Sequence, residues 1–200
     1  MPALLRALAP VLAERPMTLL GLHTRRWDQG GFLDGSISKH PEVASRIWTP
    51  DFGAVPRDIL KVMYNAADIY VSTSAEGFGL TIAEAVACGT PAVGLDYSAV
   101  PEIIGPAGQV VPVGKHMDNE YGHHWALPDE AAFGKAVAYL IDHPHRRVEM
   151  GRLGPGHVER NFRWDVAAER FIAIASQSLQ NGPRRAELQP DVSERELVAA

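Results

Sequence analysis

The sequence predicts an α/β fold with a doubly wound parallel sheet. Short apolar runs of strand length alternate with helical patterns along the chain. Such alternation is typical of strand–helix–strand crossover units, which place helices on both faces of a parallel sheet. The chain has 200 residues, 46% of them hydrophobic, which is enough for one sizeable core. We therefore expect one domain over residues 1–180 and a tail at 181–200 that lacks a sustained apolar face and is disordered.

The first half of the chain opens on a helix and then alternates. Leucine and valine recur at helical spacing over residues 3–14, and the pattern stops before Pro16. A continuous apolar run at 17–24 predicts a buried strand that feeds a turn-rich loop. A helix at 56–67 carries Pro56 in its first turn, where proline is well tolerated. The other elements expected in this half are a short helix at 40–47 and strands at 46–52 and 68–74.

The second half continues the alternation. A loop with two glycines precedes a short helix that starts near Leu80 and stops before Gly89, a residue type that favours helix ends. Apolar strands are expected at 91–95 and 108–113, and an irregular loop at 114–127. The other helices are expected from Pro101, at 129–141, at 145–153 and at 164–180, with a break at the Gly-Pro-Gly of 154–156.

The composition excludes several classes of protein. A formal net charge of −5 gives no positive field for a phosphate backbone, so nucleic acid is not expected as a partner. The single cysteine, Cys88, forms no internal disulfide or multi-thiolate metal site, which favours a reducing compartment and hence the cytoplasm. The apolar N-terminal stretch is interrupted by Pro10 and by charges, so neither a signal peptide nor a transmembrane segment is expected.

Residues 75–96, AEGFGLTIAEAVACGTPAVGLD, combine a glycine loop, a short helix and a strand. Parallel sheets bind ligands at the carboxyl ends of their strands, and this loop follows the strand at 68–74 directly. Gly77 and Gly79 allow backbone angles closed to other residues. The helix that starts near Leu80 offers unpaired N–H groups and the positive end of its dipole. The stretch therefore predicts a phosphate site that needs no lysine.

Two glutamates flank this predicted phosphate site. Glu84 lies about one turn into the helix, roughly 6 Å along its axis, and helical side chains tilt back toward the N-terminus. A carboxylate there suits a sugar diol, because its oxygens accept two hydroxyl hydrogens. Glu76 flanks the same phosphates from the loop. Two hydroxylated rings joined by a diphosphate describe a nucleotide-sugar.

The run EGFGLTIAEAVACGTPAVGLDYSAVPEIIG resembles the signature of the retaining glycosyltransferases of family 4, the group 1 transferases of GT-B fold. The shared pattern is Glu, seven residues, Glu, a small-residue helix, Cys-Gly-Thr-Pro, an apolar strand and a Pro-Glu-Ile turn. The likeness extends over roughly residues 53–175. It implies the Rossmann-like C-terminal domain of a GT-B enzyme, which binds a nucleotide-sugar and transfers the sugar with retention.

The resemblance also implies roles by position. Glu76 would be the catalytic residue, in contact with the hydroxyls of the transferred sugar, and Glu84 would bind the nucleotide ribose. Phe78 is equally consistent with a packing role. The family typically needs no divalent metal, so neither a cofactor nor a metal ligand is expected. The donor-binding residues implied are Gly77, Phe78, Gly79, Leu80, Thr81 and Glu84.

The chain departs from the family pattern at its start. In the family this domain opens with a strand and a glycine-rich loop, whose arginine and lysine neutralise the diphosphate, and neither precedes the helix at 3–14. The N-terminal domain that supplies the acceptor site is also absent. The first strand of a doubly wound sheet is central, so its loss is expected to leave a gap or to make its neighbours re-pair. We expect a donor-binding half that needs a further domain or a second chain.

Other interpretations remain open. The loop and helix at 77–82, with Asp96 after the next strand, partly match a dinucleotide fingerprint, but Ile82 stands where a third glycine is wanted. An NAD-dependent oxidoreductase is therefore a second class. A non-catalytic nucleotide-sugar-binding subunit, or a remnant of a split transferase, is a third. Arg25 and Arg26 are candidates for the missing positive charge, although exposed arginines are ordinary surface residues.

A polar cluster late in the chain invites a metal interpretation. Its spacing matches no zinc signature, so a solvated loop is the better interpretation. Its members are His116, Asp118, Glu120, His123 and His124.

Overall fold

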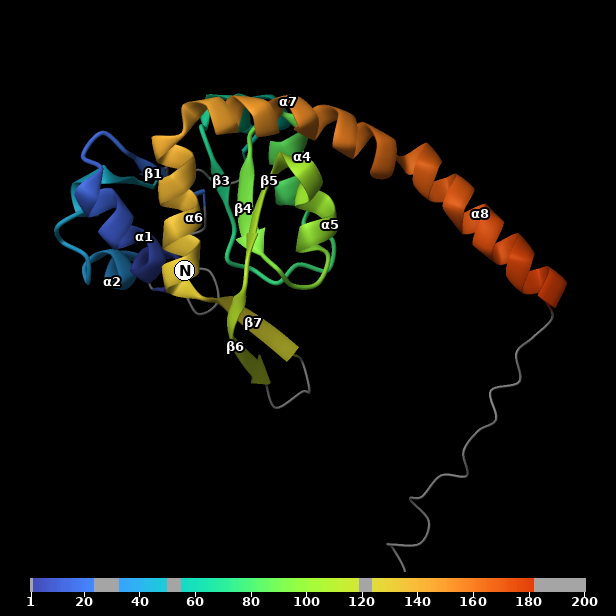
Figure 1. The fold of residues 1–200 in the computed structure, drawn as a ribbon, viewed down its shortest axis with the longest axis horizontal. Helices are drawn as coiled ribbons and strands as arrows, with labels where there is room; N and C mark the ends of the chain where they lie inside the picture. The colour runs from blue at the N-terminus through green and yellow to red at the C-terminus, as the bar shows by residue number, and fades with distance from the viewer. Residues whose placement is uncertain (1, 24–32, 50–54, 119–123, 182–200) are drawn as a thin grey trace, which may run out of the picture. The chain divides into compact units, whose positions relative to one another are not determined.

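The computed structural model describes residues 2–23, 33–49, 55–118 and 124–181. It divides the chain into two units, Met1–Arg160 and Asn161–Ala200, which we describe separately. The first unit is mixed α/β, which confirms the predicted fold class (Figure 1). Helices and strands alternate from α1 to β5, and β1 to β5 pair only in parallel among the described residues.

All the predicted strands are present, but they form two separate parallel sheets. In the two-stranded sheet, Leu20 is aligned with Ile47; in the three-stranded sheet, Ala92 is aligned with both Tyr70 and Gly108. The strands of the first sheet are β1 (Leu20–Gly21) and β2 (Ile47–Trp48); those of the second, in order, are β3 (Tyr70–Val71), β4 (Ala92–Leu95) and β5 (Gly108–Val111). Within the described residues the two sheets do not pair with each other.

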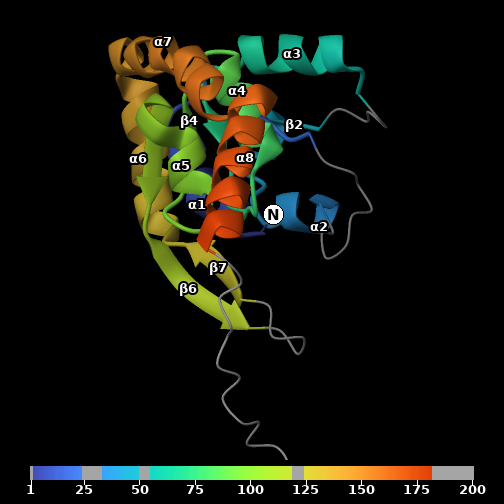
Figure 2. The ribbon, with the colours of Figure 1, turned by 90° about the vertical axis from the view of Figure 1, so that its right-hand side faces the viewer.

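Helices cover both faces of the three-stranded sheet (Figures 1 and 2). On one face, α1 (Pro2–Glu14) packs against α6 (Glu130–Asp142), which contacts β4 and β5. On the other, α4 (Leu80–Ala87) packs against α5 (Val100–Ile104), and α3 (Arg57–Ala66) packs beside α4. The unit also contains α2 (Leu33–Ile37), the 3-10 turns η1 (Ala44–Arg46) and η2 (Gly105–Ala107), and α7 (Pro144–Asn161), whose last residue falls in the second unit.

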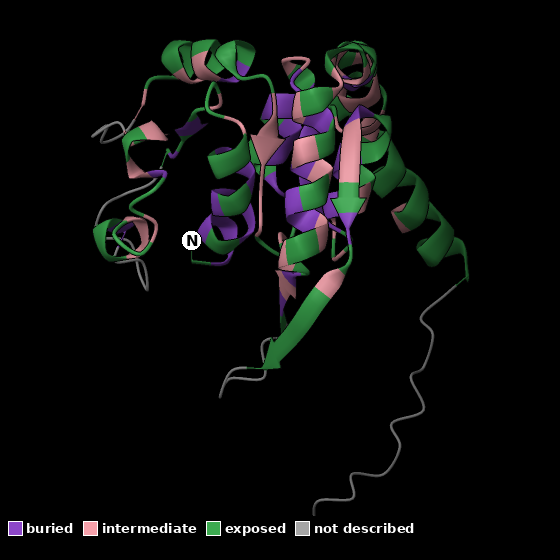
Figure 3. Ribbon diagram, turned by 60° about the vertical axis from the view of Figure 1, so that its left-hand side comes forward, coloured by how far each residue is buried: buried purple, intermediate pink, exposed green. Residues whose placement is uncertain are grey.

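One hydrophobic cluster joins both sheets to the layer formed by α1 and α6. It includes Leu5 of α1, Leu20 of β1, Val93 of β4 and Phe133 of α6. Burying a side chain of this size stabilises a fold by about 1.5–3 kcal/mol. Figure 3 shows the buried positions gathered where the helices face the strands. Because both sheets contribute to this core, they belong to one folded unit although their strands do not pair with each other.

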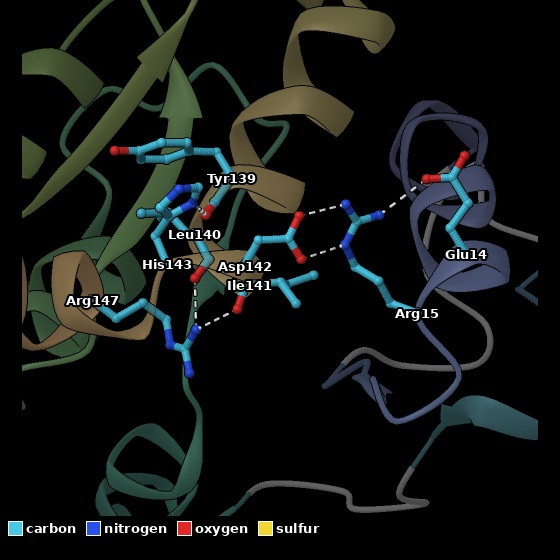
Figure 4. Close-up of polar contacts among 8 residues, drawn as sticks. All are labelled: Glu14, Arg15, Tyr139, Leu140, Ile141, Asp142, His143 and Arg147. Carbon is cyan, nitrogen blue, oxygen red and sulfur yellow. Dashed lines mark hydrogen bonds and ion pairs between the residues drawn. The ribbon is translucent and has the colours of Figure 1, made fainter.

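Polar contacts tie the C-terminal ends of α1 and α6 together (Figure 4). The guanidinium of Arg15 donates to both carboxylate oxygens of Asp142, at 3.0 and 2.6 Å. These hydrogen bonds hold the pKa of Asp142 below its usual value and raise that of Arg15.

Nη1 of Arg147 donates to the carbonyl oxygens of Leu140 and Ile141, at 2.6 and 2.8 Å. Arg147 thus satisfies backbone acceptors that the last turn of a helix leaves unpaired.

The prediction of an irregular loop at 114–127 is wrong. The chain there forms an antiparallel hairpin of β6 (Val113–Asp118) and β7 (His124–Pro128). Residues Gly114 to Asp118 of β6 are exposed, whereas Ala126 and Pro128 of β7 are buried. A hairpin of this kind leaves little buried apolar periodicity for a sequence to reveal.

The predicted break at 154–156 is also wrong, because α7 continues through Pro155. Gly154 is buried, and a Cβ at that position would lie 2.4 Å from the carbonyl oxygen of Val86 in α4. Gly154 therefore permits a close approach between α7 and α4. In the first half, the helix expected at 40–47 is reduced to η1, and α2 lies in a stretch that was interpreted as a loop.

The described part of the second unit consists mainly of α8 (Trp164–Asn181), which confirms the helix predicted at 164–180. The predicted disordered tail lies outside the described residues from 182 onward. Of the helices that the structure describes, none is long and apolar enough to cross a membrane.

Candidate functional site

The glycine loop connects the end of β3 to the start of α4, at the carboxyl edge of the three-stranded sheet. Gly79 is the N-cap of α4 and has a left-handed backbone, with φ 83° and ψ 57°, which glycine adopts at little cost. Within the described residues no side chain caps this helix end. An uncapped first turn presents backbone N–H groups and the positive end of the helix dipole. This terminus is therefore able to hold an anion.

Gly77 has a more ordinary backbone than Gly79. The φ of Gly79 lies in the left-handed region that glycine allows, whereas the φ of Gly77 does not. A Cβ at Gly77 would meet no atom within 4 Å. The folded protein itself would therefore accommodate a side chain at this position. The space beside the Gly77 backbone is open to a ligand.

Glu84 lies one turn into α4, and its side chain is held by a tyrosine from α3. The hydroxyl of Tyr64 donates to Oε2 of Glu84 at 3.0 Å, whereas Glu84 itself is exposed. Tyr64 is only 8% exposed, and its burial, followed by the hydrogen bond to the carboxylate, raises its pKa. The phenol therefore remains a neutral donor at pH 7. One oxygen of Glu84 is engaged by Tyr64, and acceptor capacity remains for a ligand.

A second tyrosine connects the sheet to the first turn of α4. The hydroxyl of Tyr70 in β3 donates to Oγ1 of Thr81 at 2.9 Å. Burial raises the pKa of Tyr70, the bond to Thr81 lowers it, and the charges of Glu76 and Glu84 raise it further. Both glutamates thus act on the pKa of the same phenol.

The remaining predicted residues lie in the loop and at the helix start. Glu76 is half-buried, and its carbonyl oxygen accepts a hydrogen bond from the N–H of Ala99 at 3.4 Å. Phe78 is 43% exposed and Leu80 is 67% exposed, so neither is a core residue. Phe78 is thus not fully buried by packing, and its donor-binding role stays a prediction. The structure brings the predicted site residues together in one loop and one helix.

The sequence analysis missed the two tyrosines. Tyr64 and Tyr70 also contact each other edge to face, with ring centroids 6.0 Å apart. The hydroxyl of the buried Thr90 donates to the carbonyl oxygen of Tyr64 at 2.6 Å, which fixes the end of α3. A buried tyrosine usually needs a partner for its hydroxyl. This rule predicts that each hydroxyl has a hydrogen-bond partner, but it does not show which acceptor is used.

The polar cluster of residues 116–124 lies only partly in the described part of the chain. No group of three or more histidine, cysteine, aspartate or glutamate side chains there is placed to hold a metal ion. His116 and Asp118 lie exposed on β6, and His124 begins β7. The other members, and the candidate basic pair, lie outside the described residues: Glu120, His123, Arg25 and Arg26.

Comparison with known proteins gives the family. The family model described as "Glycosyl transferases group 1" matches residues 52–154, more than half of the chain. The chain belongs to the group 1 glycosyltransferases. This range contains the glycine loop, α4 and both glutamates.

Similar curated proteins are longer transferases. A D-inositol 3-phosphate glycosyltransferase from Segniliparus rotundus is 30% identical over 184 residues, 90% of this chain and 37% of the relative. A GDP-mannose-dependent monoacylated alpha-(1-6)-phosphatidylinositol monomannoside mannosyltransferase from Corynebacterium glutamicum is 32% identical over 109 residues, 54% of this chain and 24% of the relative. The chain thus spans 24% to 37% of the length of these relatives.

Solved structures show the same GT-B fold. Sucrose-phosphate synthase from Thermosynechococcus elongatus aligns with a TM-score of 0.63 and 22% identity over 90% of this chain and 43% of that protein. An α,α-trehalose-phosphate synthase (UDP-forming) from Burkholderia vietnamiensis aligns with a TM-score of 0.64 and 15% identity over 88% of this chain and 42% of that protein. At these identities the likeness concerns the fold alone.

Proposed function

We propose that this chain is the donor-binding half of a retaining glycosyltransferase that uses a nucleoside-diphosphate sugar. One observation carries the proposal: the uncapped N-terminus of α4 lies beside an open glycine loop, with the exposed Glu84 one turn further on. A diphosphate would bind to the N–H groups at the N-terminus of α4, and the hydroxyls of a sugar diol would donate to the carboxylate of Glu84. Family membership supports the same interpretation.

The mechanism is electrostatic. The N–H groups and dipole of α4 stabilise the negative charge that builds on the departing nucleoside diphosphate as the glycosidic bond lengthens. Glu76 is the residue that contacts the transferred sugar and orients it. Glu84 binds the ribose, and Tyr64 holds the Glu84 carboxylate in position through its hydrogen bond. The mechanism requires no divalent metal and suits a cytoplasmic transferase.

The chain alone is proposed to be incomplete for turnover. It spans 37% of the Segniliparus relative and 24% of the Corynebacterium relative. The rest of such a polypeptide, or a second chain, would supply the acceptor site. Transfer activity is therefore expected only after that part is added. A chain that binds nucleotide-sugars but supports no transfer even then would instead be a non-catalytic binding subunit.

Calorimetric titration tests the donor class. The panel contains GDP-mannose, because one relative is named as GDP-mannose-dependent, together with UDP-glucose, GDP, UDP and NAD. We expect one nucleotide-sugar and its nucleoside diphosphate to bind, and NAD not to bind. Treatment with EDTA is expected to leave the affinity unchanged. Binding of NAD alone would favour the oxidoreductase class instead.

The role of Glu84 is tested by Glu84→Ala, with Glu169→Ala as the matched control. Glu169 is an exposed glutamate on α8 and belongs to the second unit of the chain. Loss of a charged acceptor for the ribose is expected to weaken binding about tenfold or more, which corresponds to about 1.4 kcal/mol. The control is expected to bind as the unchanged protein does. Equal affinities for the two variants would contradict the ribose assignment.

A further inference from the structure

We propose that a groove between α7 and the turns before β3 and β4 binds a phosphomonoester whose organic part carries hydroxyls. The groove has a volume of about 360 Å³. Small-molecule sites usually measure roughly 300–1,000 Å³, so a compound of the size of a sugar phosphate fits. The proposal rests on the residues that line this groove and does not depend on the proposed function.

The groove lies at the opposite edge of the sheet from the glycine loop. Asp68, just before β3, and Gly89, between α4 and β4, both line it, so it lies at the edge where these strands begin. Figure 1 shows α7 running across this edge. The glycine loop instead follows the carboxyl end of β3. A ligand in the groove therefore occupies a different place from the proposed donor.

One face of α7 forms a wall of the groove. Pro144, Val148 and Gly151 follow one another at spacings of four and three residues, so they share one side of the helix. Arg147 and Arg152 also line the groove. With 3.6 residues per turn, these two positions lie on either side of the row. Two guanidinium groups thus flank a row that carries no charge.

Two glycines bring the walls of the groove together. A Cβ on Gly151 would lie 2.4 Å from the carbonyl oxygen of Gly89, and a Cβ on Gly89 would lie 3.3 Å from the carbonyl oxygen of Gly151. The backbone of α7 therefore packs directly on the turn that follows α4. Neither glycine has a side chain to fill the space beside this contact.

The two arginines have N–H groups to spare. Nη1 of Arg147 donates to the carbonyl oxygens of Leu140 and Ile141, and Nη2 donates to Oδ1 of Asp68 at 3.4 Å, which uses three of its five N–H groups. Arg152 makes no hydrogen bond or ion pair with any residue that the structure describes. The groove thus offers unpaired donors from both guanidinium groups.

Charge and geometry favour a phosphomonoester. Arg147 and Arg152 bring two positive charges to the groove and Asp68 brings one negative charge, whereas the neighbouring Arg146 is paired with Glu149 at 2.5 Å. A phosphomonoester carries about −1.5 to −2 charges at pH 7 and three acceptor oxygens. Each planar guanidinium binds two such oxygens at once. A carboxylate has one charge and two oxygens, so it satisfies two arginines less well.

Asp68 indicates the nature of the rest of the ligand. Its side chain is 80% exposed and its contact with Arg147 is long, at 3.4 Å, so its oxygens remain available as acceptors. A carboxylate repels a phosphate but accepts hydrogen bonds from hydroxyls. Pro144 and Val148 provide apolar contact for a carbon skeleton. A sugar or polyol phosphate satisfies all of these groups.

Calorimetric titration of the full chain tests the ligand class. Glucose 6-phosphate, glucuronate and glucose share one carbon skeleton and differ in the group at carbon 6, and inorganic phosphate is the fourth probe. We expect glucose 6-phosphate to bind at least about tenfold more tightly than inorganic phosphate, and glucuronate and glucose to bind more weakly than both. Absence of binding by both phosphate probes would overturn the proposal. Equal affinities for these two would contradict the role of the hydroxyls.

Arg152→Gln tests the site itself, with Arg160→Gln as the matched control. Arg160 is an exposed arginine on the same helix, about 12 Å further along at 1.5 Å per residue. Arg152→Gln is expected to weaken binding of glucose 6-phosphate at least about tenfold, and Arg160→Gln to leave it unchanged. Arg147 is retained, because it also holds the last carbonyl groups of α6. Equal affinities for the two variants would overturn the proposal.

Nuclear magnetic resonance separates this groove from the donor site. Glucose 6-phosphate is expected to shift the amide signals of Gly89 and Gly151, whereas GDP or UDP is expected to shift those of Gly77 and Gly79. If glucose 6-phosphate shifted Gly77 and Gly79 and left Gly89 and Gly151 unchanged, the groove would not be its site. Shifts at Gly89 and Gly151 without any binding of GDP or UDP would support the groove and count against the proposed function.

Discussion

Replacing Gly79 by alanine is expected to destabilise the protein, whereas the same replacement at Gly77 is not. Gly79 has φ 83°, a left-handed conformation that costs a residue with a Cβ about 1–2 kcal/mol. Its new Cβ would also lie 3.2 Å from Cδ1 of Ile82 and 3.3 Å from Cβ of Glu76. Gly77 has no positive φ, and its Cβ would meet nothing within 4 Å.

The magnitudes separate the two variants clearly. Alanine at an unstrained glycine position stabilises by about 0.4–1 kcal/mol, because the unfolded chain loses conformational freedom. This gain is common to both variants, so they should differ by the cost of the left-handed backbone at Gly79, about 1–2 kcal/mol in the free energy of unfolding. In a chain of this size, each kcal/mol moves the melting temperature by about 2–4 °C. Gly79→Ala is expected to melt lower than the unchanged protein, and Gly77→Ala at the same temperature or slightly higher.

Urea unfolding measures the difference, provided that the slopes of the transitions agree. Donor binding should respond differently, because the Gly77 backbone faces the open space where a ligand would approach. Gly77→Ala is expected to bind the nucleotide-sugar about tenfold more weakly while it folds normally. Equal unfolding midpoints for the two variants would refute the backbone argument. Unchanged donor affinity in Gly77→Ala would refute the close approach of the ligand.

Two further changes test the contacts around the site. Tyr64→Phe removes the hydrogen bond to Glu84. In the folded protein the pKa of Tyr64 is raised above its unfolded value of 10.0. The stability that the neutral Tyr64 contributes is therefore present below pH 10 and is lost as the pH rises above 10. Thermal unfolding should show stability falling more steeply with pH above 10 in the unchanged protein than in Tyr64→Phe, and identical pH profiles would contradict this. Gly154→Ala should cost about 1–3 kcal/mol, because its Cβ would lie 2.4 Å from the backbone oxygen of Val86. Gly156→Ala is the control, since its Cβ would meet the flexible end of an arginine side chain. Equal urea midpoints for Gly154→Ala and Gly156→Ala would be evidence against the close packing of α7 on α4.

The alternating strands and helices were predictable because their signals are local. A strand such as β4 is a continuous apolar run, and all its residues are buried. α7 was not predicted as one helix, because its Gly-Pro-Gly disfavours helix locally and only the approach to α4 explains Gly154. The hairpin of β6 and β7 was missed because β6 is exposed from Gly114 to Asp118 and so has no buried apolar face. A helix or strand is thus predicted reliably from the local sequence when its burial gives it a regular pattern of apolar residues.

The candidate site was predictable in its backbone and not in its side-chain partners. The glycine loop and the helix after it form one continuous stretch, so their geometry followed from residues 75–96. The bond between Tyr64 and Glu84 joins two helices and residues 20 positions apart. No local sequence signal shows which of several possible acceptors the hydroxyl of a buried tyrosine will use. The same limit applies to Tyr70 and Thr81.

The most direct test of the account measures hydrogen exchange at the N–H groups of Leu80 and Thr81, with and without ligand. We propose that a diphosphate binds at this helix end. Saturating nucleoside diphosphate, chosen as the binder found in the titration panel, is therefore expected to slow exchange at these two positions. The corresponding nucleoside, which lacks the phosphates, is expected to leave exchange unchanged. Protection elsewhere in the chain, or equal effects of the nucleoside and its diphosphate, would contradict the central claim.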